Sequence, residues 1–322
     1  MSYRIPIIFD TDIGVDDAFA LLLAAGNTNI DILGITTVFG NNSVDNCTEN
    51  ALRICELLDL NVPVAKGARK ALFGEEKDYT LHKNNFVHGE DGLGGKRYML
   101  KDPRKKVEDC DAVDLIARMV RRSDEKVVLV PVGPLTNIAM FLLTYPELKS
   151  QIDGIALMGG AAYGGNYLPL AEANIANDPE AAKIVFQSGL KLVMCGLDAT
   201  EKAMISKDDR EMLRVVGGSI GSFYYEMVKD YVAVSERFDP NRMGPCLHDS
   251  VPVAWLINPD IVKTEPCHVE VDIIGQYSKG CTVTDVLCRD NKPNAMVAFD
   301  LDRDEFIKLH LDALKWLNRN NQ

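Results

Sequence analysis

The sequence predicts an α/β fold in which a single open, mostly parallel, Rossmann-like sheet is flanked by helices. Two observations lead to this prediction. In the first two thirds of the chain, short runs rich in β-branched residues alternate with longer stretches whose apolar residues recur every three or four positions. Such alternation is typical of βαβ units, in which helices cover both faces of a parallel sheet. The last third is less regular and holds two strand-like runs, which predict an additional β pair near the C-terminal end.

The predicted elements of the first two thirds follow one another in order. Asp178 and Pro179 mark one helix start directly, because Asp is a favoured N-cap and Pro fits the first helical position. The predicted strands are residues 5–9, 30–38, 62–65, 126–132, 154–158 and 190–195. The predicted helices are residues 17–26, 44–60, 112–122 and 137–148, and one that starts at Asp178.

The last third completes a single predicted domain over residues 1–322, because no linker, low-complexity tract or internal repeat divides the chain. One segment departs from this compactness. Residues 71–95 are polar and end rich in glycine, and loops of this length are usually lids or binding loops. The predicted elements of the last third are helices at residues 219–234, 249–256 and 304–317, and an edge β pair at residues 269–274 and 282–287.

The composition is that of an ordinary soluble protein, with 47% of the 322 residues hydrophobic and 25% charged. A formal net charge of -12 argues against nucleic acid or an anionic membrane as a partner, because proteins that bind them usually carry basic patches. The eight cysteines are scattered and form no Cys-x-x-Cys pair, so we expect reduced thiols. The chain enters its first strand at once and has no apolar stretch long enough to span a bilayer, which predicts a cytoplasmic protein.

Four carboxylates stand directly behind the first predicted strand. Residues 10–17 read Asp-Thr-Asp-Ile-Gly-Val-Asp-Asp. Each carboxylate raises the cost of ionising its neighbours unless a cation or hydrogen-bond donors compensate. Asp17 alone could be a helix cap, but capping does not account for four acids. A hard divalent cation such as Ca²⁺ or Mg²⁺ does, since it binds carboxylate and carbonyl oxygens.

Several distant segments are expected to meet this acidic loop, because ligands of open parallel sheets bind beyond the carboxyl ends of the strands. The segments carry carboxylates, carboxamides and glycine-bearing turns but no Lys or Arg, which suits a metal and a neutral, hydroxyl-rich ligand better than phosphate. Taken singly, Asn41 or Asn174 could be a turn residue, and His248 could make only a structural hydrogen bond. The predicted rim segments are residues 10–17, 40–42, 133–137 and 159–160, with Asn166, Glu172 and Asn174.

Together these residues resemble the nucleoside hydrolase family, in particular its inosine-uridine-preferring ribonucleoside N-ribosyl hydrolases. The resemblance covers nearly the whole chain and rests on segments that occur in order. They are the octet at residues 10–17, Thr-Thr-Val-Phe-Gly-Asn at 36–41, His88-Gly89, Gly-Pro-Leu-Thr-Asn at 133–137, Met158-Gly159-Gly160, Glu172-x-Asn174 and His248-Asp249. The resemblance implies an enzyme that hydrolyses the N-glycosidic bond of ribonucleosides to ribose and free base.

The resemblance also implies a Ca²⁺ cofactor and roles for individual residues. Asp12 would activate the attacking water, and His248, with an ordinary pKa near 6.5, would protonate the departing base. The implied Ca²⁺ ligands are Asp12, Asp17, the backbone carbonyl of Thr136 and Asp249, with Asp10 supporting the loop from behind. The implied substrate-binding residues are Asp16, Asn41, Met158, Asn166, Glu172, Asn174, Asp249 and His88. We further expect Phe86, His88, Tyr225 and Tyr231 on the base side, and a homodimer or homotetramer as the assembly.

Two positions depart from the family pattern, and two rival hypotheses stay open. Ile13 replaces a common proline, and Ala173 replaces a bulky aromatic residue, which opens the ribose or base pocket and leaves the preferred base undetermined. A haloacid-dehalogenase-like phosphatase would use Asp10 as nucleophile and Asp12 as acid, with Mg²⁺. The acidic loop could also serve a non-catalytic calcium- or ribose-binding protein. Release of free ribose from nucleosides distinguishes the hydrolase from both rivals.

Overall fold

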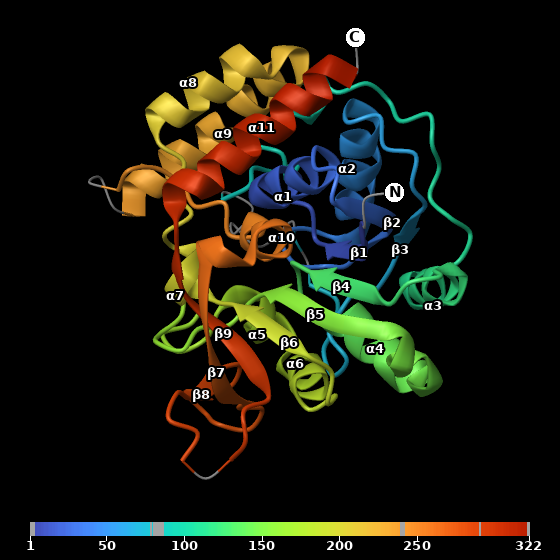
Figure 1. Ribbon diagram of the computed structural model, residues 1–322, viewed down its shortest axis with the longest axis vertical. Helices are drawn as coiled ribbons and strands as arrows, with labels where there is room; N and C mark the ends of the chain where they lie inside the picture. The colour runs from blue at the N-terminus through green and yellow to red at the C-terminus, as the bar shows by residue number, and fades with distance from the viewer. Residues whose placement is uncertain (1–3, 78, 80–86, 239–241, 290, 321–322) are drawn as a thin grey trace.

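A single nine-stranded sheet runs through the part of the chain that the structure describes, residues 4–77, 79, 87–238, 242–289 and 291–320 of this computed structural model (Figure 1). The strands are β1 (Ile5–Thr11), β2 (Ile30–Thr37), β3 (Val64–Lys66), β4 (Val127–Pro131), β5 (Ile152–Met158), β6 (Leu192–Cys195), β7 (Val262–Val271), β8 (Thr282–Asp285) and β9 (Ala295–Leu301). Their order is β3-β2-β1-β4-β5-β6-β9-β7-β8. Strands β1 to β6 and β9 are parallel, whereas β7 runs antiparallel to β9 and β8. The predicted open, mostly parallel sheet is confirmed, and β7 and β8 are the predicted β pair.

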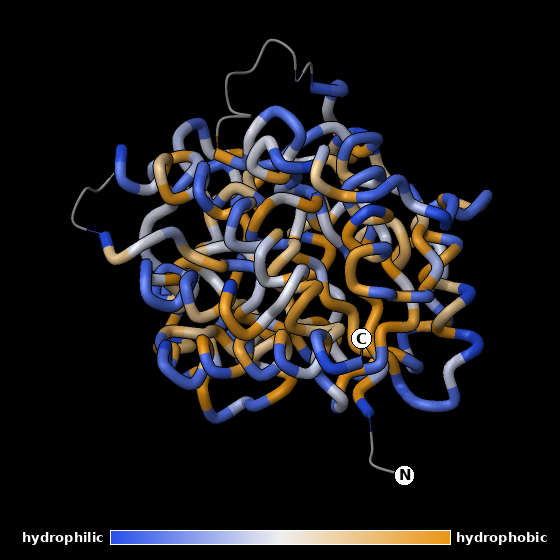
Figure 2. Tube along the Cα trace, turned by 90° about the horizontal axis from the view of Figure 1, so that it is seen from above, coloured by the Kyte–Doolittle hydropathy of each residue, from blue (hydrophilic) through white to orange (hydrophobic). Residues whose placement is uncertain are grey.

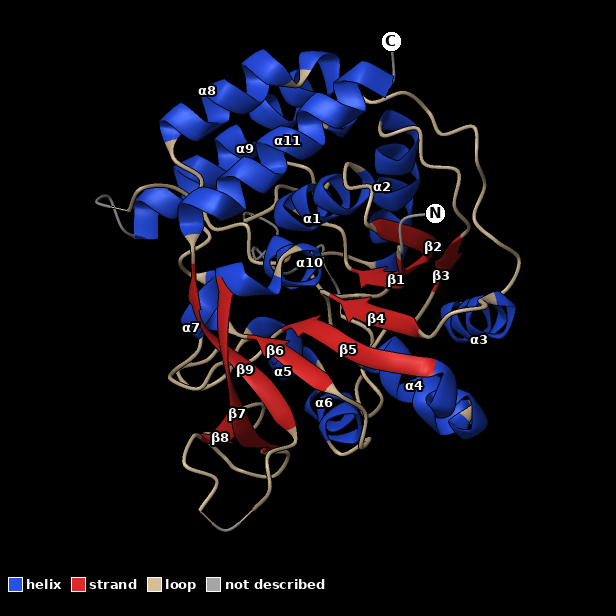
Figure 3. Cartoon of the chain, in the orientation of Figure 1, coloured by secondary structure: helices blue, strands red, loops and turns tan. Residues whose placement is uncertain are grey.

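Helices cover both faces of this sheet, and the buried apolar side chains form one cluster on each face (Figure 3). One face carries α1 (Val15–Ala25), α2 (Val44–Leu57), α8 (Lys207–Val216), α9 (Gly218–Phe238), α10 (Ser250–Ile257) and α11 (Arg303–Asn320). The other face carries α3 (Ala112–Arg122), α4 (Thr136–Thr144) and α6 (Pro179–Phe186). Two short helices, α5 (Ala173–Asn177) and α7 (Leu197–Thr200), follow β5 and β6. Figure 2 shows the hydrophilic segments concentrated along the outer loops, and none of the described helices could cross a membrane.

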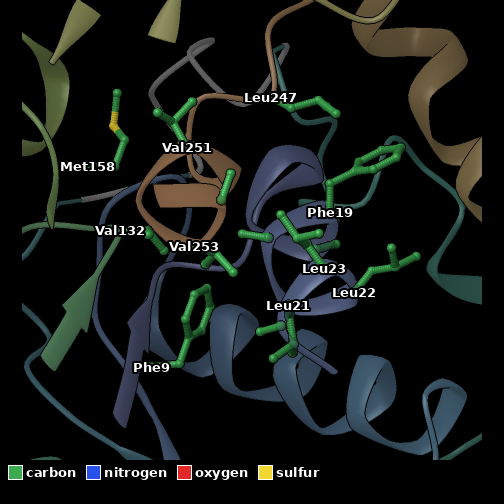
Figure 4. Packing of buried hydrophobic residues seen from close by; sticks show 14 of the residues in the cluster. Phe9, Phe19, Leu21, Leu22, Leu23, Val132, Met158, Leu247, Val251 and Val253 are labelled. Carbon is green, nitrogen blue, oxygen red and sulfur yellow. The ribbon is translucent and has the colours of Figure 1, made fainter. Parts of the chain in front are cut away.

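Helix α1 is buried among its neighbours and fixes the position of two acidic residues. Its Phe19 packs edge-on against Tyr224 of α9, with ring centroids 4.9 Å apart, and the Tyr224 hydroxyl donates to a backbone carbonyl of α1 at 2.8 Å. Helix α1 also packs against α10, and Figure 4 shows side chains of both in one cluster. Asp16 and Asp17 lie in the first turn of α1, and Asp249 directly precedes α10. The packing of the two helices therefore holds these three carboxylates together.

Several elements differ from the sequence prediction, and the short helices α5 and α7 are among those that were not predicted. Helix α8 was not predicted, although Ser206 and Asp209 form a capping box at its start. Strand β9 was not predicted either, and it lies inside the sheet between β6 and β7. The predicted helix at residues 137–148 is too long, because α4 ends at Thr144 and Pro146 starts a separate 3₁₀ turn, Pro146–Gln151. A proline disfavours the α conformation of the residue before it, which ends the helix there.

Candidate functional site

The candidate site lies where the connections of the sheet change direction. From β1 the chain moves outward through β2 to β3, and β4 lies on the other side of β1 and leads outward to β5 and β6. The loops that leave the carboxyl ends of β1 and β4 therefore diverge and leave a crevice between them. A cavity of about 610 Å³ opens at this point, with Asp16, Asn41, His248 and Asp249 among its lining residues. Of the rim predicted from the sequence, Asp16, Gly40, Asn41, Asn166, Glu172 and Asn174 line this cavity, whereas residues 133–137 and 159–160 do not.

The carboxylate of Asp12, beyond the end of β1, is held between two glycine turns. A Cβ atom added to Gly40 would lie 2.0 Å from Asp12 Oδ2, and one added to Gly133 would lie 2.8 Å from Oδ1. Oδ2 accepts the backbone N–H of Asn41 at 2.6 Å, whereas Oδ1 is buried without a hydrogen-bond partner among the described residues. Burial, and then the neighbouring Asp17, raise the pKa of Asp12. One oxygen of Asp12 is therefore available to a cation or a water molecule.

Asp17 is both a helix cap and a member of the acidic group. Its Oδ1 accepts from Thr11 Oγ1 at 2.5 Å, and its Oδ2 accepts from the Gly14 N–H at 2.7 Å and from Asn41 Nδ2 at 3.1 Å. The bond from Gly14 is the capping interaction at the start of α1. Asp17 can therefore cap α1 and belong to the acidic group at the same time, because the donors that form the cap also stabilise its negative charge.

Asp10 lies behind this loop and ties three elements together. Its Oδ1 accepts from Thr36 Oγ1 of β2 at 2.5 Å and from Asn137 Nδ2 of α4 at 2.7 Å. Asn137 Nδ2 also donates to the backbone carbonyl of Thr37 at 3.0 Å. Burial raises the pKa of Asp10 to about 7. These contacts suit the supporting position predicted for Asp10.

A buried acidic cluster, formed by Asp16, Asp17 and Asp249, offers one oxygen from each residue within 4.8 Å of the others. Burial, and then Asp17, raise the pKa of Asp16 to about 8. Burial, and then Asp16, raise the pKa of Asp249. Asp16 Oδ1 has no hydrogen-bond partner in the part of the chain that the structure describes. Carboxylates crowded in this way need a proton or a cation between them, so the donor set fits a hard divalent metal.

The geometry groups the acidic residues differently from the ligand set that the resemblance implies. Asp16, rather than Asp12, belongs to the group of mutually close oxygens, although the charge of Asp12 also raises the pKa of Asp249. Thr136 is buried at the start of α4, where its hydroxyl donates to Asp178 Oδ2 at 2.6 Å. This bond fixes the turn whose carbonyl is the predicted ligand. The assignment of ligands stays a prediction.

Glu172, Asn174 and Met158 form one wall of the cavity. Glu172 caps α5, with Oε1 accepting the Asn174 N–H and Oε2 the Gly160 N–H, both at 2.9 Å. Asn174 Nδ2 donates to the Met158 carbonyl at 3.2 Å, which ties α5 to the end of β5. Asn166 Oδ1 accepts a backbone N–H of α5 at 3.0 Å. The predicted substrate-binding residues of this region therefore meet at one place.

Two histidines reach the cavity from other segments. His88 Nδ1 accepts a backbone N–H of α1 at 3.2 Å, and its ring centroid lies 5.5 Å from that of Tyr231. His248 Nδ1 lies 2.8 Å from Thr200 Oγ1. Burial lowers the pKa of His88 to about 4 and the pKa of His248 to about 3. The expectation of an ordinary pKa for His248 is therefore wrong, and both rings are neutral at pH 7 in this state.

Several cavity residues were not predicted. Lys77 and Arg242 bring positive charge to a rim for which the sequence indicated none, and both come from irregular segments outside the motifs. Of the expected base-side residues, Phe86 lies outside the described residues, and Tyr225 instead donates to Glu211 of α8 at 2.6 Å. Other lining residues that were not predicted include Tyr79, Tyr167, Asn177, Glu201 and Ser235.

Carboxylates that stabilise positive charge on a sugar, in a cavity that two histidines also line, suit the hydrolysis of a glycosidic bond. The class of enzyme is thus an N-glycosyl hydrolase, and the comparisons agree. A family model described as inosine-uridine preferring nucleoside hydrolase matches residues 7–308. The chain belongs to this family, which replaces the phosphatase hypothesis.

Relatives and solved structures of similar proteins cover almost the whole chain. The pyrimidine-specific ribonucleoside hydrolase RihA of Shigella boydii is 41% identical over 314 residues, which are 97% of this chain and 99% of that protein. RihA of Salmonella newport is 40% identical with the same coverage. The structure of a purine-preferring ribonucleoside hydrolase from Gardnerella vaginalis has a TM-score of 0.91 at 34% identity and covers 98% of this chain and 99% of its own. The plant nucleoside hydrolase PpNRh1 has a TM-score of 0.89 at 30% identity, covering 97% and 99%.

Proposed function

We propose that this protein hydrolyses the N-glycosidic bond of ribonucleosides to ribose and free base, with Ca²⁺ as cofactor and pyrimidine nucleosides as preferred substrates. The observation that carries the proposal is the acidic cluster beside a cavity of about 610 Å³, a volume typical of small-molecule sites. The pyrimidine preference is supported by the RihA proteins, which are pyrimidine-specific and 40–41% identical to this chain.

The sugar is the part of the substrate on which positive charge develops, because N-glycosidic cleavage passes through an oxocarbenium-like state. Carboxylates aimed at that charge stabilise it. When bound, Ca²⁺ would lower the pKa of a water molecule and orient the ribose 2′- and 3′-hydroxyls. Asp12 is the proposed general base, since its free Oδ1 is available to take a proton from the attacking water. The proposed ribose contacts are Asp16, Asn41, Asn166, Glu172, Asn174 and Asp249.

The departing base must gain a proton or have its negative charge stabilised, and His248 is the proposed donor. Its ring is neutral in the substrate-free site, because burial lowers its pKa to about 3. Negative charge that develops on the base raises the pKa of the neighbouring imidazole, so the ring can take up a proton from solvent and pass it to the base. The Thr200 hydroxyl, 2.8 Å from Nδ1, orients the ring for this transfer.

A reducing-sugar assay on uridine, cytidine, inosine and adenosine tests the proposal. Ribose release is expected to be fastest from uridine and cytidine, to stop with a chelator and to return with Ca²⁺. No release from any of the four nucleosides in saturating Ca²⁺ would overturn the proposed function, and equal recovery with Mg²⁺ would overturn the assignment of the metal. We also propose a homodimer or homotetramer, which the molar mass from light scattering would test.

A further inference from the structure

We propose that Lys77 is a specificity-determining residue that donates a hydrogen bond to the oxygen carried by C5′ of the bound riboside. This inference rests on the proposed function, because it assumes a ribose above the acidic cluster. It assigns a role to a cation that no motif of the chain includes. Lys77 lies in the long segment at residues 71–95 and lines the cavity.

Lys77 is held in place by neutral groups. Its Nζ donates to Asn177 Oδ1, and it lies 5.6 Å from the ring centroid of Tyr167. Among the described residues it forms no ion pair, and burial lowers its pKa. An ammonium has three N–H donors, so donors remain for a ligand after the bond to Asn177. A half-buried cation without a paired carboxylate is costly to keep unless something in the cavity uses it.

The direction of C5′ follows from the shape of ribose. When the 2′- and 3′-hydroxyls contact the acidic cluster, C1′ and C4′ lie on opposite sides of the C2′–C3′ edge. The base on C1′ would face His248, which the proposed function places at the leaving group, and His88, which the sequence places on the base side. C5′, which C4′ carries, would then face away from the histidines, and we place it at the part of the lining that follows β5, which includes Asn166, Tyr167 and Asn177. Lys77 contacts two of these three residues.

The space at this end is open because residue 173 is small. Ala173 lines the cavity, and its backbone N–H is fixed by Asn166 Oδ1 at 3.0 Å. The methyl side chain of Ala173 leaves room for a C5′ substituent, and the amine of Lys77, which lines the same cavity, offers it a charged donor. An acceptor oxygen there can belong to a hydroxyl or to a phosphate ester. We expect the hydroxyl, because the acidic cluster repels a phosphate dianion.

Substrates that differ only at C5′ test this inference in the holoenzyme. The substrates are uridine, 5′-deoxyuridine and uridine 5′-monophosphate, and the variant is Lys77→Met, which keeps an unbranched side chain one heavy atom shorter and removes the amine. We expect this variant to lower kcat/KM for uridine about ten- to hundredfold, as for a lost charged hydrogen bond, and to leave 5′-deoxyuridine within about twofold. The matched control is Lys70→Met, which changes an exposed lysine directly before this segment that does not line the cavity and should change neither value.

Each possible result of these measurements either supports or overturns the role of Lys77. Equal losses on uridine and 5′-deoxyuridine would overturn the inference, because the lysine would then act on something other than the C5′ oxygen. Cleavage of uridine 5′-monophosphate that Lys77→Met removes would support it, with phosphate as the source of the oxygen. If the wild-type protein releases no ribose from any substrate, the proposed function fails. The inference is then tested by calorimetric measurement of ligand binding to the wild type and to Lys77→Met. Tighter wild-type binding of uridine than of 5′-deoxyuridine, lost in Lys77→Met, would support the inference, and equal affinity for both would overturn it.

Discussion

His248 is the residue whose environment differs most from the sequence expectation, and its role can be tested through the leaving group. We expect His248→Ala to lower ribose release from inosine more than from a nitrophenyl riboside, because an activated leaving group needs no proton. The loss on inosine should be about 10²- to 10⁴-fold, as for other general acids. Steady-state kinetics on both substrates measure the difference, and equal losses would remove His248 from the acid role.

Gly40 makes the position of the Asp12 carboxylate testable without changing a charge. In Gly40→Ala the new Cβ would lie 2.0 Å from Asp12 Oδ2, so the carboxylate must move. Displacement of a catalytic group by about 1 Å can lower the rate about a hundredfold, and we expect a loss of this order in kcat/KM. Gly189→Ala is the control, since Gly189 also has a positive φ, of 75°, but no atom lies within 4 Å of its added Cβ. Similar losses in both variants would show that backbone strain, not Asp12, is responsible.

The site residues that strand topology predicts are those that follow strands. Asp12 and Asn41 come soon after strand ends, and Glu172 caps the first helix after β5, so the topology of a parallel sheet is enough to bring them together. Lys77 and Arg242 could not be predicted in this way. They come from irregular segments whose course depends on tertiary packing. The low pKa of His248 was likewise beyond prediction, because burial of a side chain is not visible in its immediate sequence.

At the scale of elements, the N-cap of α6 also supports the site. Asp178 Oδ1 accepts the Ala181 N–H at 3.1 Å, and Oδ2 accepts from Thr136 Oγ1 at 2.6 Å and from the Leu72 N–H at 2.9 Å. One side chain therefore joins α6 to α4 and to the loop at residues 71–95. Loss of this carboxylate should affect both stability and the turn at Thr136.

We expect Asp178→Ala to lower the free energy of unfolding by more than the roughly 1 kcal/mol typical of a lost N-cap, because two further donors lose their acceptor. Asp111→Ala is the matched control, since Asp111 caps α3 through the Asp114 N–H at 2.9 Å and lies at the surface. Urea denaturation of both variants gives the comparison. An equal effect of the two substitutions would show that the bonds to Thr136 and Leu72 add nothing.

Element boundaries were predictable where a local signal ends a helix or where strands alternate with helices. The Asp-Pro signal predicts the start of α6 at Pro179. Pro146 is a signal of the same kind for the end of α4 at Thr144, although the predicted helix at residues 137–148 extends past it. Strand β9 follows β7 and β8 without an intervening helix, so the βαβ pattern does not predict that it lies beside β6. Its place depends on pairing between segments far apart in the chain.

At the scale of the whole molecule, the buried carboxylates make the metal-free protein sensitive to pH. The pKa of Asp10 is raised to about 7 and that of Asp16 to about 8, so the folded state binds protons that the unfolded state, with ordinary values near 3.8, has released. Their stabilising contribution is complete below pH 3.8 and is lost as the pH rises through 7 and 8. The buried His88, His248 and His310 have lowered pKa values and act in the opposite direction, but only below about pH 6.5.

Between pH 6.5 and 8 only the carboxylates contribute, so the free energy of unfolding in chelator should fall by roughly 2 kcal/mol. Urea denaturation at several pH values measures this decrease. Asp16→Asn should flatten the curve, because it removes the group with the higher of the two pKa values, and Ca²⁺ should stabilise the wild type more at pH 8 than at pH 6.5. Stability that stays constant or rises over this window would contradict the prediction.

The acidic cluster joins the first helix of the chain to a residue in its last third, which has a consequence for biosynthesis. Asp16 and Asp17 leave the ribosome early, whereas Asp249 follows only after six strands of the sheet have been made. Domains form as units during synthesis, and contacts between distant segments come late. The nascent chain thus assembles most of its parallel sheet before it meets the full repulsion of the three carboxylates. Any cation that the cluster binds would act on an almost complete fold, as its final stabilising step rather than as its nucleus.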